Sequence, residues 1–279
     1  ASGQGVPYNV IIDGGNVYSK TDVNVPRYLR GSLTINTGKS FSLSQTAFGD
    51  LYVAADWTNN GTFNANDRKV TFNGTTAQNI NTATNFGYVT IDNNTTFNAD
   101  ISIKFLLINS GKTFASQSGS ARTLTIANGG SITNNGTFIP YDGWVTFLGN
   151  NTITGTIEFY NTSIENNGVD FGTASTIKNI LLINQSGFVN INAPTYAEGS
   201  TLKYWTNSLY NRRVEWSAQT GRGYPWHVQL SNNTILNLGY ESPAVQKGCA
   251  GNLTIDANSA LYMDYNTDDM TEDLVVKGN

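Results

Sequence analysis

The sequence predicts an all-β protein, namely a right-handed parallel β-helix (β-solenoid) with about three short strands per rung of roughly 20 residues. Three observations predict this fold. A short apolar phrase recurs at a nearly fixed spacing, clusters of Asn and Gly interrupt every strand-like segment, and no helical periodicity of any length is present. A unit of this size cannot bury its own apolar side chains, so it is stable only when it stacks on its neighbours.

The recurring phrase is three residues long. Its first and third residues are apolar, and the residue between them is usually Thr. The first seven occurrences begin 18, 19, 19, 17, 18 and 21 residues apart, and a last pair is separated by 21 residues. They are Leu33–Ile35, Leu51–Val53, Val70–Phe72, Val89–Ile91, Leu106–Ile108, Leu124–Ile126 and Val145–Phe147, followed by Leu253–Ile255 and Leu274–Val276. Because a β-sandwich gives turns every 8–12 residues without such a longer period, the spacing favours stacked coils, about 14 of them.

Corners between the strands are predicted where Asn and Gly cluster, because these residues adopt the positive φ angles of sharp turns. The clearest corners are Asn59–Gly61, Asn73–Gly74, Asn128–Gly130, Asn134–Gly136 and Asn166–Gly168. In the unit that runs from Leu124 to Phe138 they divide three short strands.

Composition supports this architecture and excludes two classes of partner. Charged residues make up 13% of the chain, and uncharged Asn, Thr and Ser take their place. We expect these side chains to hydrogen bond along the stack, where repeated like charges would repel. A net charge of -4 leaves no basic surface for nucleic acid, and no apolar stretch is long enough for membrane insertion. The absence of an initial Met fits a mature secreted product or a fragment, and the single Cys249 forms no internal disulfide.

The chain is expected to form one continuous domain, residues 1–279, with an aromatic-rich loop insertion at about 194–227. Four aromatic residues of this region are candidate ligand contacts, since Tyr and Trp offer large rigid surfaces to sugars or proteins. They are Tyr204, Trp205, Tyr210 and Trp226. In the alternative interpretation the aromatic side chains, above all Trp216 and Tyr224, form a small core that holds the loop.

Several motifs resemble a group of secreted, adhesin-like β-helix repeat proteins of Bacteroidetes, which are cargo of the type IX secretion system. The motifs are Trp57–Phe63, Val70–Ile80, Glu215–Pro225, Gly251–Ile255 with Leu261 and Met263, and Leu274–Asn279. The resemblance lies mainly in residues 51–97 and 195–279. It implies an extracellular or cell-surface location and a chain that is a segment of a longer one, although the C-terminal sorting domain of such proteins is not present.

The expected function is a non-catalytic structural or adhesive rod of a cell-surface protein that assembles end to end with other copies or with further rungs of the parent chain. One alternative is a carbohydrate-binding module that uses the aromatic loops to hold surface glycans. Another is a polysaccharide lyase or glycosidase, for which the densest acidic cluster is Asp268, Asp269, Glu272 and Asp273. Adjacent strand residues point to opposite faces, so this cluster is not expected to be catalytic. No cofactor is expected: His227 is the only His and is predicted to lie in a loop, and calcium is left open.

Overall fold

The computed structural model describes residues 5–19, 25–240, 246–270 and 273–279, and the account below covers these residues. They form parallel strands stacked as a β-solenoid of about 12 turns with a spacing of about 21 residues, which confirms the predicted fold class with fewer turns than expected. One short 3-10 helix, η1 (Val214–Trp216), is the single helix among them. No described helix has the length and apolar character needed to cross a membrane. The chain divides into two compact units, residues 1–143 (unit 1) and 144–279 (unit 2), which are described in turn.

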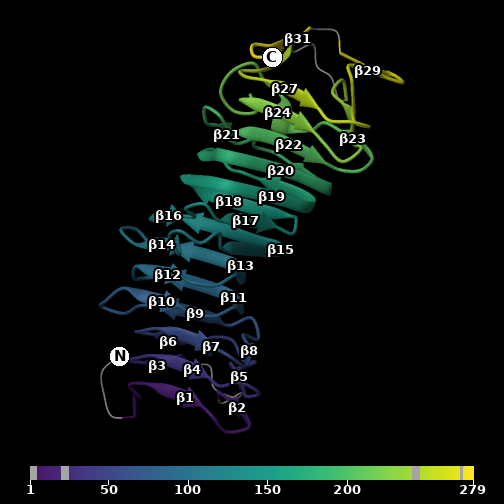
Figure 1. Cartoon of the computed structure of the whole chain (residues 1–279). Coiled ribbons are helices and arrows are strands. Elements are labelled where there is room, and N and C mark those ends of the chain that lie inside the picture. The colour runs from purple at the N-terminus through teal and green to yellow at the C-terminus, as the bar shows by residue number, and fades with distance from the viewer. Residues whose placement is uncertain (1–4, 20–24, 241–245, 271–272) are drawn as a thin grey trace. The chain divides into compact units, whose positions relative to one another are not determined.

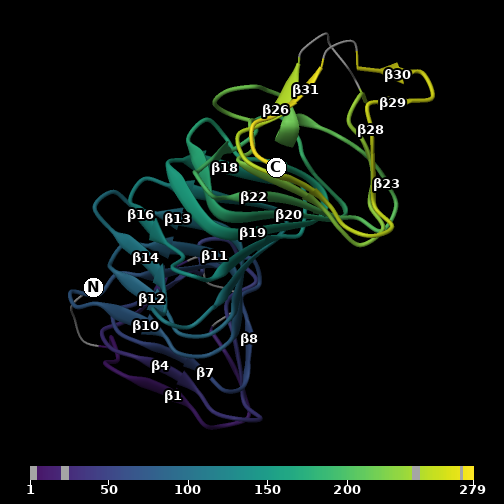
Figure 2. The same ribbon diagram turned by 45° about the horizontal axis from the view of Figure 1, so that its top comes forward.

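Unit 1 consists of coils whose strands align in three parallel sheets (Figure 1). Sheet I contains β1 (Val10–Ile12), β4 (Leu33–Ile35), β7 (Trp57–Asn59), β10 (Gln78–Ile80), β12 (Thr95–Phe97), β14 (Thr113–Ser116) and β16 (Thr137–Ile139). Sheet II contains β3 (Arg27–Leu29), β6 (Leu51–Val53), β9 (Lys69–Phe72), β11 (Thr84–Ile91), β13 (Ile101–Ile108) and β15 (Thr123–Asn134). Sheet III contains β2 (Asn16–Tyr18), β5 (Ser40–Ser42) and β8 (Thr62–Asn64). Figure 2 shows the strands of sheet I side by side.

The recurring phrase marks sheet II only in part. Leu51 pairs with Val70, and Val89 pairs with both Val70 and Leu106, so intervals of 19, 19 and 17 residues are true coil lengths. The interval of 18 residues before Leu51 is not a coil length, because the first phrase, Leu33–Ile35, belongs to sheet I.

A second exception follows at the end of unit 1. Leu106 pairs with Ile132, whereas Leu124 pairs with Ile101. The segment Leu124–Ile132 therefore lies in one long strand, β15, and not in two strands separated by a corner. The same apolar phrase satisfies any buried strand, so it does not identify the sheet to which it belongs.

The interior of unit 1 is filled by side chains from the three sheets. An aromatic cluster of Trp57, Phe63, Phe72 and Phe86 lies inside the coils, with ring centroids 4.7–6.4 Å apart. Trp57 is fully buried, and its indole N–H donates to Thr84 Oγ1 at 3.1 Å, so its polar group is satisfied. The apolar side chains of each coil are thus buried against those of the neighbouring coils, as the sequence predicted.

The predicted positive φ angles occur at Gly129 and Asn167, but other corners require glycine for a different reason. Gly61 and Gly136 do not have positive φ angles. A Cβ atom at Gly61 would lie 2.3 Å from the carbonyl oxygen of Lys39 in the preceding coil. At Gly136 it would lie 2.3 Å from the carbonyl oxygen of Lys112. Close stacking, and not turn geometry, therefore excludes side chains here.

Uncharged side chains link successive coils, as expected from the composition. Asn98 Nδ2 donates to Asn81 Oδ1 at 3.0 Å in unit 1, and Asn179 Nδ2 donates to Asn161 Oδ1 at 2.7 Å in unit 2. Further inter-coil pairs of uncharged side chains are Asn64 to Ser42, Ser186 to Asn166, Asn233 to Asn207 and Asn237 to Asn211. In two similar pairs an Asn donates to a carboxylate, Asn109 to Asp92 and Asn192 to Asp170. These pairs extend the backbone ladders sideways.

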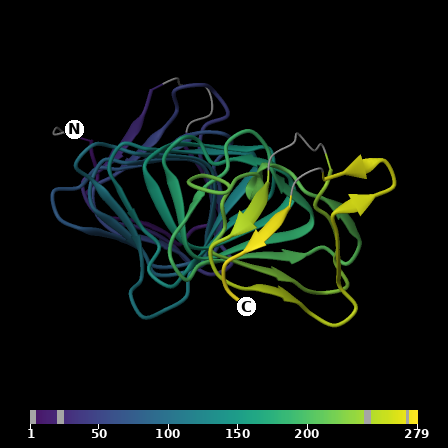
Figure 3. The ribbon, with the colours of Figure 1, turned by 90° about the horizontal axis from the view of Figure 1, so that it is seen from above.

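Unit 2 repeats the same principle around a different set of strands. Sheet IV contains β17 (Trp144–Phe147), β19 (Ile157–Asp170), β20 (Ser175–Val189), β22 (Thr201–Trp205), β24 (His227–Leu230) and β27 (Leu253–Ile255), with β18 (Asn151–Gly155) and β21 (Thr195–Tyr196) beside it. Sheet V contains β23 (Leu209–Asn211), β25 (Ile235–Asn237) and β28 (Ala260–Tyr262). Outside these, β26 (Lys247–Cys249) pairs with β31 (Leu274–Val276), and β29 (Asp264–Tyr265) forms an antiparallel hairpin with β30 (Asp268–Asp269), seen apart from the sheets in Figure 3.

The predicted loop insertion at 194–227 is wrong in part, because regular strands continue through it. β22 pairs with β20 on one side and β24 on the other, and β23 pairs with β25. Only residues 212–226 depart from the coil pattern; this segment, which contains η1, is called the 212–226 loop below. His227 begins β24 and so does not lie in a loop. The expectation of one continuous domain stays a prediction.

Candidate functional site

The 212–226 loop is fixed by a buried carboxylate, Glu215, which lies on η1 and is fully buried. Its Oε1 accepts hydrogen bonds from Tyr204 Oη at 3.3 Å, Tyr210 Oη at 3.2 Å and the Arg213 backbone N–H at 2.9 Å. Tyr196 Oη donates to the Glu215 carbonyl oxygen at 2.9 Å. One acidic residue therefore ties three strands to the loop.

Burial controls the titration of this cluster. It raises the pKa of the Glu215 carboxyl above its ordinary value, against the lowering effect of the hydrogen bond from the Arg213 backbone. The same burial, aided by the nearby Glu215 charge, raises the pKa values of Tyr196, Tyr204 and Tyr210 well above the ordinary value for tyrosine. The second carboxyl oxygen of Glu215, Oε2, is buried and has no hydrogen-bond partner among the described residues. All three phenols thus stay neutral donors toward Glu215.

Two of the four predicted ligand contacts are not available to a ligand. Tyr204 is fully buried and Tyr210 is 7% exposed, and both hydroxyl groups are directed at Glu215. A ring enclosed in this way cannot stack on a sugar or fill a pocket in a partner. The alternative structural interpretation of the aromatic region therefore holds for these two residues, whose burial satisfies a polar group inside the unit.

The same interpretation holds for Trp216. Trp216 is fully buried, and its indole N–H donates to the carbonyl oxygen of Gly248 at 2.7 Å, which joins the loop to β26. Nearby, the buried Arg212 donates to the carbonyl oxygens of Leu238, Arg213 and Tyr240. A guanidinium group can bond several carbonyl oxygens at once because it presents several donors in fixed directions.

The third predicted contact, Trp226, is half-buried, and the backbone at Gly251 lies close to its ring. A Cβ atom at Gly251 would lie 3.0 Å from the Trp226 ring and 2.5 Å from His227 Nδ1. His227 Nδ1 accepts the backbone N–H of Asn252 at 2.8 Å. Trp226 and His227 thus pack against the next coil, and the role of Trp226 in ligand binding stays a prediction.

The fourth predicted contact, Trp205, lies in a groove on the outer face of sheet IV. The groove has a volume of about 360 Å³, and six residues line it. They are Trp144 on β17, Ile180, Leu182 and Asn184 on β20, and Lys203 and Trp205 on β22. We call this the Trp144–Trp205 groove. Trp205 is 42% exposed, so the groove offers an accessible indole.

Register explains why these side chains meet. Ile180, Leu182 and Asn184 occupy alternate positions of β20, and alternate residues of a strand share one face. Leu182 pairs with Lys203 and Asn184 with Trp205, so the two strands contribute neighbouring side chains to the same face. Trp144 on β17 pairs with Asn161 on β19, and Asn161 pairs with Ile180 on β20. Trp144 therefore lies in the same row across the sheet as Ile180 and points to the same face.

Charges around the groove are balanced. The Lys203 ammonium group lies 4.9 Å from the centroid of the Trp205 ring, within range of a cation–π contact. Asn184 Nδ2 donates to Glu165 Oε2 at 2.8 Å. Hydrogen bonds from Ser231 and Gln229, and in smaller part the charge of Lys203, lower the pKa of Asp256. The groove therefore combines two indoles and an aliphatic floor with one cation and amide groups, without a concentrated charge of either sign.

Residues of this groove other than Trp205 were missed in the sequence, although one signal was present. The run Ile180–Ile183 is apolar at four consecutive positions, where a half-buried strand normally alternates. Leu181 and Ile183 fill the core, while Ile180 and Leu182 lie at the outer face. An uninterrupted apolar run in an otherwise alternating repeat thus marks an outer surface with apolar character.

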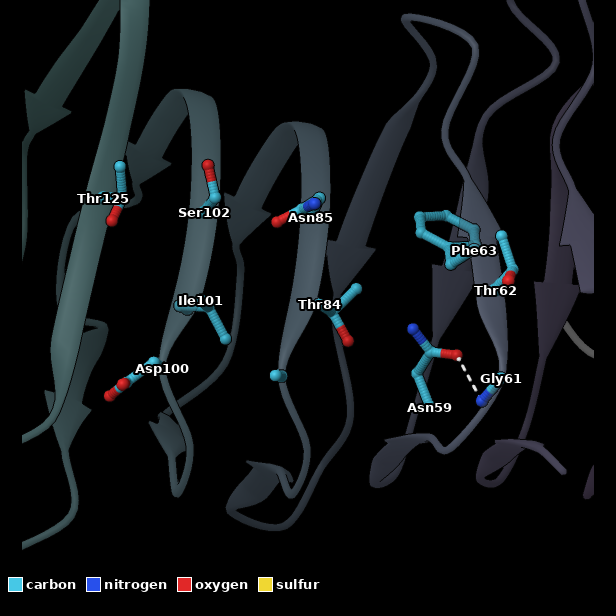
Figure 4. Close-up of a pocket in the computed structure, with 11 residues that line it drawn as sticks. Asn59, Gly61, Thr62, Phe63, Thr84, Asn85, Asp100, Ile101, Ser102 and Thr125 are labelled. Atoms are coloured by element: carbon cyan, nitrogen blue, oxygen red, sulfur yellow. Dashed lines mark hydrogen bonds between the residues drawn. The ribbon is translucent and has the colours of Figure 1, made fainter. Parts of the chain in front are cut away.

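Unit 1 has a polar hollow of about 370 Å³ where sheet III ends at β8 (Figure 4). Thr62 and Phe63 of β8 face Thr84 and Asn85 of β11 across it. Ser102 on β13 and Thr125 on β15 continue its wall, together with Asp100 just before β13. Asp100 Oδ1 already accepts the Thr123 backbone N–H at 2.8 Å. The hollow exists because the coil that contains β11 has no separate strand above β8.

The acidic cluster named in the enzyme alternative is described only in part. Asp268 and Asp269 form β30, Glu272 lies outside the described residues, and Asp273 precedes β31. Among the residues that the structure describes, no group of three or more His, Cys, Asp or Glu side chains could hold a metal ion. Cys249 is fully buried, and burial raises the pKa of its thiol to about 11.

Comparisons with protein families, with curated proteins and with solved structures found no match to this chain.

Proposed function

We propose that this chain is a non-catalytic structural or adhesive segment of an extracellular cell-surface protein. The observation that supports the proposal is the inter-coil pairing: within each unit, parallel ladders and uncharged side-chain pairs join each coil to the next. Such pairing makes a stiff scaffold that needs no cofactor or ligand to hold its shape. The titratable cluster around Glu215 is buried, and its hydrogen bonds lie within unit 2.

The location is tested on intact cells of the source organism. An antibody raised against the purified chain is expected to label unbroken cells as strongly as permeabilised ones. Labelling that appears only after permeabilisation contradicts the proposal. The absence of catalysis is tested separately, by incubating the chain with acidic and neutral polysaccharides and measuring new reducing ends or unsaturated products. Product formation that is lost in Asp268→Asn would make the chain an enzyme.

End-to-end stacking is a second part of this proposal, and exposed apolar residues on terminal coils favour it. In unit 2, β27 is the end strand of sheet IV and β28 the end strand of sheet V, and Ile255, Tyr262 and Met263 near them are 39–46% exposed. In unit 1, Ile11 on β1 and Tyr18 on β2 are 61–65% exposed. End strands with exposed apolar side chains are a template for another coil, although on β27 the Leu253 N–H already donates on this side to the Asn279 carbonyl oxygen.

Electron microscopy of the purified chain tests this part. Filaments that shorten when Ile255→Lys is introduced would support stacking through β27. Particles of one uniform length at all concentrations would limit the proposal to a scaffold that is extended only by its own parent chain.

A further inference from the structure

We infer that the Trp144–Trp205 groove on sheet IV is a binding site for a neutral glycan chain. The inference rests on the proposed adhesive function and supplies the class of ligand that the surface would hold. It narrows the predicted contact surface of residues 194–227, where Tyr204 and Tyr210 are buried, to Trp205 and the outer face of the neighbouring strands.

The size of the groove favours an oligosaccharide over a folded protein. Its volume of about 360 Å³ falls at the lower end of the range of about 300–1,000 Å³ that is typical of small-ligand sites. A stable protein–protein interface needs about 800 Å² from each partner, much more than six side chains of a shallow groove provide. The groove therefore matches a ligand that is narrow and lies along the surface.

The chemistry of the lining matches a pyranose chain. A sugar ring presents C–H groups on its faces and hydroxyl groups around its edge. The indoles of Trp144 and Trp205, with the aliphatic floor of Ile180 and Leu182, can cover the faces. Asn184 and Lys203 are placed to hydrogen bond the edge hydroxyls, since amide and ammonium groups donate to such oxygens.

Geometry sets the direction and the minimum length of the ligand. β17 and β22 are separated by β19 and β20, so their backbones lie about 14 Å apart at about 4.8 Å per strand. Trp144 is in the column of Thr201, and Trp205 is four residues farther along β22, about 13 Å away. The two indoles therefore mark the ends of a diagonal path, which a chain of several rings can span and a monosaccharide cannot.

Balanced charge favours a neutral chain. Lys203 is the one charged residue that lines the groove, and its ammonium group already lies 4.9 Å from the centroid of the Trp205 ring. Glu165, which accepts from Asn184, adds a negative charge at the same border. An acidic polysaccharide would bring many charges to a surface that offers no surplus of cations.

The test is affinity gel electrophoresis of the purified chain in gels that contain soluble neutral glucans, xylans or mannans, or acidic polysaccharides of similar length. We expect retardation by at least one neutral polymer, and a loss of affinity of about tenfold or more in Trp205→Ala and in Trp144→Ala. Tyr160→Ala is the matched control, because Tyr160 is 39% exposed on β19 but does not line the groove. Circular dichroism melting curves of all three variants verify that the fold is retained.

Three results would overturn the inference: no retardation by any neutral polymer, retardation only by acidic polymers, or equal retardation of the wild type and both Trp variants. Capture of a protein instead, with loss in the same variants, would also replace the glycan by a protein partner. None of these results changes the labelling of intact cells, so failure of the glycan inference and failure of the proposed surface function are distinguishable.

Discussion

Unit 1 and unit 2 use the same stacking principle but differ in what they bury. Among the described residues of unit 1, every buried polar side chain is uncharged, as for Ser42, Gln78 and Thr95. The described residues of unit 2 include three buried ionisable ones, Arg212, Glu215 and Lys247. Arg212 and Glu215 hold the 212–226 loop, and Lys247 lies on β26, which accepts the hydrogen bond from the loop's Trp216.

The difference shows where a β-solenoid needs buried charge. A regular coil satisfies its backbone groups by pairing with the next coil, so apolar packing and neutral side chains are sufficient. The 212–226 loop has no such ladder. Some of its backbone groups bond to other backbone groups, as Ser217 N–H does to the Gly223 carbonyl, but those of Arg213 are satisfied by the buried side chains of Arg212 and Glu215. Such ionisable side chains cost more to bury but form stronger hydrogen bonds.

The largest effect is expected from truncating the buried tryptophan of each unit. Trp57→Ala and Trp216→Ala each remove a fully buried indole and its hydrogen bond. We expect Trp57→Ala to lower the free energy of unfolding by about 3–5 kcal/mol, because it empties the centre of stacked coils. Urea unfolding followed by circular dichroism measures this loss.

Trp216→Ala should act more locally, because the side chain joins a loop to β26 and is not part of a continuous stack. Limited trypsin digestion is expected to cut this variant first at Arg212, Arg213 or Arg222. If Trp57→Ala instead gave early cleavage in the 212–226 loop, and Trp216→Ala did not, the contrast between the two units would be wrong.

A smaller effect is expected at the corners of unit 1. Gly61→Ala places a methyl group against the Lys39 carbonyl, so adjacent coils must separate, at a cost of about 1–3 kcal/mol. Gly14→Ala is the matched control, since a Cβ atom there has no neighbour within 4 Å. Urea midpoints of the two variants give the comparison. Equal midpoints would show that the coils have room to move at this corner.

The smallest effect concerns the pH dependence of unit 2. The pKa of Glu215 is raised in the folded state by burial. The folded state therefore holds its proton more tightly than the unfolded state, and stability is greatest below the unfolded pKa of about 4.5 and falls as pH rises toward the folded pKa. Glu215→Gln should remove this part of the slope. Unfolding free energies from pH 4 upward test it, and an unchanged slope in the variant would exclude Glu215 as the cause.

Much of the fold could be predicted because stacked coils place apolar residues at regular intervals in the sequence. The phrases at Leu51, Val70, Val89 and Leu106 do stack in register, at the intervals read from the sequence. The phrase at Leu33 does not, because strands of sheet I and sheet II bury the same kinds of side chain. Nor does the phrase at Leu274 pair with that at Leu253, since β31 pairs with β26 and β27 with β24.

The candidate site was less predictable, for a physical reason. Tyr204 and Trp205 are neighbours on β22 and so point to opposite faces, but which face is the interior, and that Tyr204 and Tyr210 share Glu215 there, depends on the three-dimensional structure. Trp144 lies far from Trp205 in the chain, and register alone brings them to one groove. Local sequence patterns contain neither relationship.

The contact between Gly61 and the Lys39 carbonyl restricts how a protein of this kind can change in length during evolution. A single inserted or deleted residue between Lys39 and Gly61 would displace the glycine from that carbonyl and turn the following strand's apolar side chains outward. Insertion of a complete coil preserves both relationships. Descendants of this chain should therefore grow or shrink by whole coils, while point insertions survive only at corners such as Gly14, where a neighbouring coil does not approach.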